Sequence, residues 1–157
     1  MVEHFLSLKG ADERMRLWCL FRFALFRKQP IDAARYLERL SSRDFDPDRI
    51  YEANGPFPYS EKWLLCFSSG ILDLVNKEWA GAVRFFETAL EIETSAEVLN
   101  NLGIALREMG DYIGAENRFL QALKKFPGYA DARDNLSGGK GGITFHPLRR
   151  EASRSEY

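Results

Sequence analysis

An internal repeat with a period of 33 residues constrains the fold of this chain more than any other feature. The segment AVRFFETALEI, which begins at Ala82, superimposes on AENRFLQALKKF, which begins at Ala115. In this register Phe86 falls on Phe119, and the upstream Gly70 falls on Gly103. A period of this length is typical of stacked supersecondary units, because each unit buries its apolar face only against its neighbours.

Helix start and stop signals divide the remaining chain into short helices. A mostly apolar helix ends at Gln29, and Pro30 suits the first turn of a second helix through Leu40, where its missing N–H costs nothing. No window alternates with period two for long enough to predict a strand. We therefore expect an all-α chain. Its parts would be a helical part at 1–59, two hairpins with a capping helix at 60–137, and a flexible, glycine-rich tail at 138–157.

Residue sizes in the second unit predict how its two helices pack. Small residues at Gly103 and Ala115 let two antiparallel helices approach closely. We expect Tyr112, Phe119 and Leu123 to fill the space between these helices, because protein interiors leave few voids.

Capping residues predict where the helices of this unit begin and end. Gly110 suits the left-handed residue that closes the first helix, and Asp111 suits the N-cap of the next one. Thr94, with Glu97 three residues later, has the spacing of a capping box at the start of the first helix.

The segment AEVLNNLGIALREMGDYIGAENRFLQALKKFPGYA, residues 96–130, resembles a tetratricopeptide repeat. The residues that carry the resemblance are Leu99, Leu102, Gly103, Leu106, Tyr112, Ala115, Phe119, Ala122 and Pro127. The preceding unit, residues 63–95, is similar but departs from the pattern at Ser69, Asp73 and Thr94. The segment IDAARYLERL resembles the second helix of a further repeat, so residues 1–59 are open to interpretation as a degenerate hairpin.

The resemblance implies a right-handed superhelical array of antiparallel hairpins, an α-solenoid, that acts as a non-catalytic adaptor or scaffold. In such arrays a concave groove holds a peptide or helix of another protein. The residues that the resemblance assigns to this partner-binding groove are Leu64, Phe67, Ile71, Leu74, Glu97, Asn100, Asn101, Ile104, Arg107, Glu108, Asp131 and Asn135.

The first four of these residues form an apolar stripe that has two interpretations. Either the chain's own N-terminal helices pack on the stripe, or part of it is open and binds apolar residues of a partner. A homodimer through this stripe or through the N-terminal helices is a further alternative. The tail residues Ile143, Phe145 and Leu148 would also allow the tail to fold back into the groove.

The asparagines predict a different kind of contact. Asn101 and Asn135 occupy equivalent places 34 residues apart, and an Asn amide offers both a donor and an acceptor. A ladder of such amides can pair with an extended main chain of any sequence, as in the repeat domain of O-linked N-acetylglucosamine transferases, which this stretch resembles locally. The alternative is that these asparagines are simply tolerated and solvated.

Composition excludes several classes of function. With 22 Lys and Arg against 23 Asp and Glu, the net charge of −1 provides no global field for nucleic acid or an anionic membrane. His4 and His146 are not in a metal-spaced cluster, and no phosphate loop or acid–base pair is evident. Cys19 and Cys66 lie in apolar runs that favour buried free thiols. We expect no enzyme activity, cofactor, metal or membrane insertion, and a cytoplasmic location.

The sequence therefore predicts a non-catalytic protein–protein interaction module that binds a peptide or partner helix. One alternative is a small secretion-type chaperone with tetratricopeptide repeats. The other is a substrate-recognition accessory of a glycosyl- or methyl-transferase.

Overall fold

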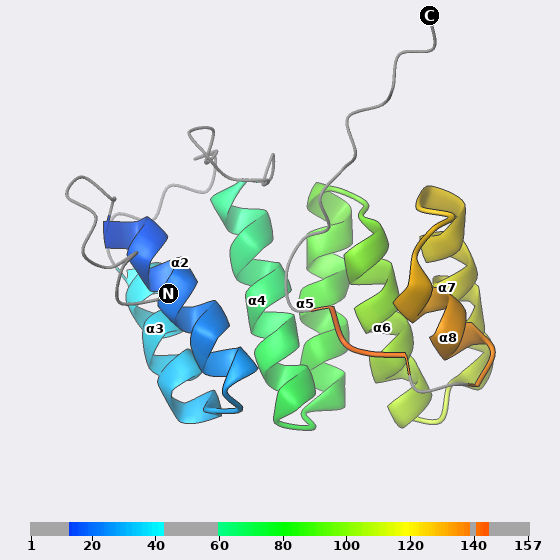
Figure 1. Ribbon diagram of the computed structural model, residues 1–157, viewed down its shortest axis with the longest axis horizontal. Helices are drawn as coiled ribbons and strands as arrows, with labels where there is room; N and C mark the ends of the chain where they lie inside the picture. Colours follow the sequence, from blue (N-terminus) through cyan, green and yellow to red (C-terminus); the bar gives the residue numbers. More distant parts are fainter. Residues whose placement is uncertain (1–12, 43–59, 139–140, 145–157) are drawn as a thin grey trace, which may run out of the picture.

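The computed structural model of this chain describes residues 13–42, 60–138 and 141–144. Over these residues its secondary-structure elements are all helices, which confirms the all-α prediction (Figure 1). The helices are α2 (Glu13–Phe26), α3 (Pro30–Ser42), α4 (Glu61–Val75), α5 (Trp79–Ile92), α6 (Ala96–Glu108), α7 (Tyr112–Lys125) and α8 (Ala130–Leu136). Both histidines and most of the tail lie outside the described residues.

The helices follow one another as a row of hairpins (Figure 1). Helices α2 and α3 pack together, as do α4 with α5 and α6 with α7, and α8 packs on α7 at the end of the row. Each hairpin also contacts the next, through α3 with α4 and α5 with α6. The arrangement is that of a tetratricopeptide-like solenoid, in which the core is shared serially between neighbours. Among the described helices, none is long and apolar enough to cross a membrane.

Local capping chemistry sets the ends of the helices. Gly110 has φ +89°, and the Asp111 carboxylate accepts a hydrogen bond from the Gly114 N–H at 2.8 Å, so both predictions at this turn are confirmed. The prediction for the start of α6 was wrong by one residue. Its N-cap is Ser95, whose hydroxyl accepts from the Val98 N–H at 3.2 Å, because Ser95 has the extended backbone that a cap requires.

The two central hairpins are closed by the same pair of residue types. A Cβ added at Gly70 would lie 2.5 Å from the Phe86 ring, and one added at Gly103 would lie 2.6 Å from the Phe119 ring. Both rings are fully buried. The glycines thus provide the space in which an aromatic ring of the second helix lies against the first helix.

One part of the packing prediction was wrong. Phe119 is buried and Leu123 is half-buried, but the Tyr112 side chain is 70% exposed. Tyr112 is the first residue of α7, where the chain has just left the turn, so its side chain does not reach the space between the helices. The Phe119 ring occupies the space beside Gly103.

The core consists of two clusters. The larger extends from α2 to α7 and includes Phe21, Trp63, Phe67, Phe86 and Phe119. The smaller lies beneath α8 and includes Leu99, Ala122 and Tyr129. Cys19 and Cys66 are free and half-buried, and burial raises the pKa of both thiols.

Candidate functional site

The apolar stripe on α4 is part of the core. Leu64, Phe67, Ile71 and Leu74 are all buried, and they belong to the same cluster as apolar residues of α2 and α3. The Phe67 ring is stacked on Trp63 with centroids 4.9 Å apart and lies 6.5 Å from Phe86. These four side chains are therefore not available to a partner in this structure, and the reason is that other parts of the same chain cover them.

The amide-bearing positions lie together at the other end of the row. Asn100 and Asn101 on α6 and Asn135 on α8 are buried, the first two completely. The Asn135 Nδ2 donates to Asn100 Oδ1 at 3.0 Å, and the Asn100 Nδ2 lies 3.4 Å from Asn101 Oδ1. Three amides from two helices thus form one connected group, because α8 packs close to α6.

Residues 141–144, here called the docked segment, lie across α6 beside these amides (Figure 1). The Asn101 Nδ2 donates to the Thr144 carbonyl oxygen at 2.9 Å, and its Oδ1 accepts from the Thr144 N–H at 2.9 Å. One side chain thus satisfies both main-chain groups of a single residue, which is how a neighbouring strand would pair with it.

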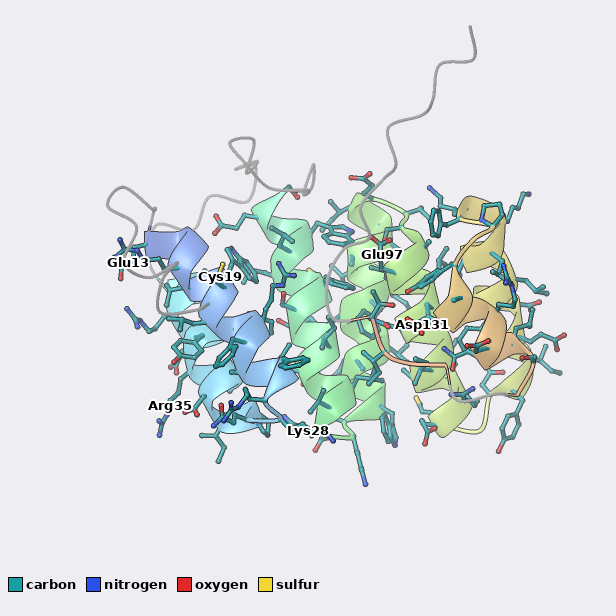
Figure 2. The ribbon with its side chains drawn as sticks, viewed as in Figure 1. Glu13, Cys19, Lys28, Arg35, Glu97 and Asp131 are labelled. Carbon is teal, nitrogen blue, oxygen red and sulfur yellow. The ribbon has the colours of Figure 1, made fainter. Side chains whose placement is uncertain are left out.

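Two further hydrogen bonds hold the main chain of Gly142. The Asn100 Nδ2 donates to the Gly142 carbonyl oxygen at 3.1 Å, and the Gly142 N–H donates to Asp131 Oδ1 at 3.4 Å. Asp131 lies on α8 close to the docked segment (Figure 2). Helices α6 and α8 therefore hold the docked segment from two sides.

The side chain of Thr144 is held as well. Its hydroxyl is hydrogen-bonded to the Tyr129 hydroxyl, and the two residues are 5% and 3% exposed. Burial raises the pKa of the Tyr129 hydroxyl above its usual value.

Arg107 connects the last turn of α6 to α8. Its guanidinium donates to Asn135 Oδ1 at 3.3 Å and lies 3.5 Å from the Asn135 carbonyl oxygen. The same group lies over the Phe119 ring at 5.6 Å. Because a guanidinium donates and never accepts, the Asn135 amide turns its oxygen toward Arg107 and its nitrogen toward Asn100. We call Arg107, Asn135, Asn100 and Asn101 the amide relay.

The remaining predicted groove residues are not all in this site. Glu97 and Ile104 on α6 are buried, Ile104 as a member of the larger core cluster. Glu108 is exposed at the end of α6. Of the predicted set, the structure brings Asn100, Asn101, Arg107, Asp131 and Asn135 together around the docked segment.

Four residues of the site were not predicted, namely Tyr129, Gly141, Gly142 and Thr144. Tyr129 lies just before α8, and the other three lie in a tail whose glycines indicated only flexibility. The sequence did indicate that the tail could fold back into the groove through the apolar residues Ile143, Phe145 and Leu148. In the structure Ile143 is half-buried against the larger cluster, whereas Phe145 and Leu148 lie outside the described residues.

Residues 96–129 match the sequence model of the Tetratricopeptide repeat family. No curated protein matches the chain. The matched range covers α6 and α7 and ends at Tyr129, so it includes the relay residues of α6.

Proposed function

The chain contains a tetratricopeptide repeat at residues 96–129, and on that premise we propose that it is a non-catalytic module that binds an extended segment of another protein on the face of α6 and α8. Such repeats generally mediate protein–protein interaction. The observation that carries the proposal is the pair of hydrogen bonds between the Asn101 amide and the main chain of Thr144. Main-chain pairing of this kind supplies affinity for any extended polypeptide.

The contact surface in this proposal is narrower than the one expected from the sequence. The stripe on α4 is buried, so it is not part of the proposed contact surface. The amides around Asn101 and the hydroxyl of Tyr129 are neutral donors and acceptors, which suit a polypeptide main chain and polar side chains. We therefore assign recognition to hydrogen bonding rather than to charge.

The proposal predicts that a peptide binds in place of the docked segment. The protein would be the chain ending at Ser137, labelled with ¹⁵N, and the probe an unlabelled peptide of residues 138–150. The side-chain amide resonances of Asn100 should shift saturably. Loss of the two Asn101 hydrogen bonds, worth about 1 kcal/mol each, should weaken binding at least tenfold in Asn101→Ala.

Two controls make this experiment decisive. Asn117→Ala removes an exposed amide on α7 and should leave affinity unchanged. The full chain should bind the peptide more weakly than the chain ending at Ser137, because its own segment occupies the site. A titration without saturable shifts, or equal affinities for wild type and Asn101→Ala, contradicts the proposed function. Circular dichroism shows whether the shortened chain keeps its helices.

A further inference from the structure

The site tolerates different side chains at each of the four residues of the docked segment. In the docked segment Asn101 and Asn100 bond only main-chain atoms, and so these bonds do not distinguish one sequence from another. Any preference for particular residues must come from the surroundings of residues 141, 142, 143 and 144. Those surroundings are different at each position.

The first position accepts only glycine. A Cβ built on Gly141 would lie 2.7 Å from the Asn135 main-chain nitrogen, 2.6 Å from its Cγ, and closer still to the Asp131 carbonyl oxygen. Two of these three atoms belong to the main chain of α8, which cannot move aside without unwinding the helix. Any larger residue would therefore push the segment away from α8.

The second position provides an internal contrast. A Cβ on Gly142 would meet only Asp131 Oδ1 at 3.7 Å, which is ordinary van der Waals contact, and the residue is exposed. Its hydrogen bonds to Asn100 and Asp131 use main-chain atoms and survive any side chain other than proline. The second position therefore accepts nearly any residue.

The third and fourth positions are selective for different reasons. Ile143 packs against the larger core cluster, so an aliphatic side chain fits there. The Thr144 hydroxyl is buried against the Tyr129 hydroxyl, and a side chain without a hydroxyl would take this hydrogen-bond partner away from Tyr129 inside the protein. Serine would keep the hydroxyl.

We propose that the groove between α6 and α8 recognises an extended segment with glycine at the first position, any residue at the second, an aliphatic residue at the third and threonine or serine at the fourth. The chain's own residues 141–144 are a resident copy of this ligand. The occupant of the groove in a complex is a partner segment with the same pattern, which displaces the resident copy. This inference rests on the proposed function and adds the class of sequence that the site binds.

The test uses the full chain and the hydrogen-exchange protection of the residue 144 amide, which donates to Asn101. Gly141→Ala should lower this protection at least tenfold, whereas Gly142→Ala, its matched control, should stay within about threefold of wild type. Thr144→Val should lower it at least tenfold, and Thr144→Ser should stay close to wild type. None of these residues lies in a helix, so the helical circular dichroism should be unchanged throughout.

A second experiment tests the glycine preference on a separate peptide. Full-chain Gly141→Ala, whose own segment is displaced, is titrated with peptides of residues 138–150 that have either glycine or alanine at position 141. The glycine peptide should bind at least tenfold more tightly than the alanine peptide. Equal protection in Gly141→Ala and Gly142→Ala, unchanged protection in Thr144→Val, or equal affinity of the two peptides overturns the inference. The hydrogen-exchange series tests the sequence preference without any added peptide. The titration of the chain ending at Ser137 tests the proposed function, so the two proposals can fail independently.

Discussion

The hairpins α4–α5 and α6–α7 share one packing scheme and differ on the face of their first helix. In the 33-residue register Leu64 corresponds to Glu97, Phe67 to Asn100 and Leu74 to Arg107. On α4 the residues are apolar and lie in a core shared with α2 and α3. On α6 they are polar, and Asn100 bonds the docked segment while Arg107 bonds Asn135 on α8. The residues between the paired helices are therefore alike in the two hairpins. The residues on the face of the first helix differ in polarity, and each face matches the segment that covers it.

Exchanging an apolar face residue for its polar counterpart should have the largest effect. Phe67→Asn would leave a cavity beside Trp63 and Phe86 and bury an amide without a partner, so the free energy of unfolding should fall by at least about 4 kcal/mol. An apolar residue at the corresponding position, Asn100→Leu, should cost only about 1–2 kcal/mol, because the docked segment can leave for water. Urea unfolding measures both. Equal costs would show that the two faces are not different environments.

Filling the space beside Gly70 or Gly103 should lower the free energy of unfolding by a smaller amount, similar for the two positions. Gly70→Leu and Gly103→Leu each place a side chain where a Phe ring lies, and overpacking should lower the free energy of unfolding by about 3 kcal/mol. The corresponding fall in Tm is on the order of 10 °C. Gly128→Ala is the control, because Phe126 is 4.0 Å from its added Cβ. If only one of the two glycine variants were destabilised, the shared packing scheme would be refuted.

Replacing Arg107, the first residue of the amide relay, with its counterpart in the α4–α5 hairpin should have the smallest effect. Arg107→Leu gives α6 the residue type of Leu74 and removes the donor that orients the Asn135 amide. We expect the peptide of residues 138–150 to bind the chain ending at Ser137 a few-fold more weakly, and stability to change by about 1 kcal/mol or less. Arg118→Leu on α7 is the matched control. Peptide affinity that is unaffected by Arg107→Leu would show that the relay does not depend on its arginine.

Local signals predicted the helices well, because glycine, proline and capping residues act within one turn. Gly110 and Asp111 illustrate this, and the error at Thr94 was only a choice between adjacent hydroxyl residues. Tyr112 was misplaced because the repeat pattern gives its spacing and not the direction of its side chain at the start of α7. What covers α4 was left as two alternatives, since no local signal shows which distant segment packs there.

The sequence assigned individual residues to the helical side of the site, whereas for the tail it offered only the hypothesis that Ile143, Phe145 and Leu148 allow it to fold back. The resemblance to a tetratricopeptide repeat assigned Asn100, Asn101, Arg107, Asp131 and Asn135 to the groove, and the structure brings these five residues together around the docked segment. The contacts from Asn100 and Asn101 to residues 142 and 144 cross more than 40 positions, and the glycines around residue 141 indicated flexibility. The close approach of Gly141 to α8 is a property of the folded main chain, and composition does not reveal it.

The amide relay has a consequence for the orientation of whatever binds. Arg107 fixes the Asn135 amide, Asn135 fixes Asn100, and Asn100 fixes Asn101, so the oxygen and nitrogen of Asn101 have set positions. A segment lying in the reverse N-to-C sense would bring its N–H groups to the Asn101 nitrogen and its carbonyls to the Asn101 oxygen, where neither can bond. The groove therefore has a polarity. It accepts a polypeptide in one N-to-C direction only, whatever the sequence of that polypeptide.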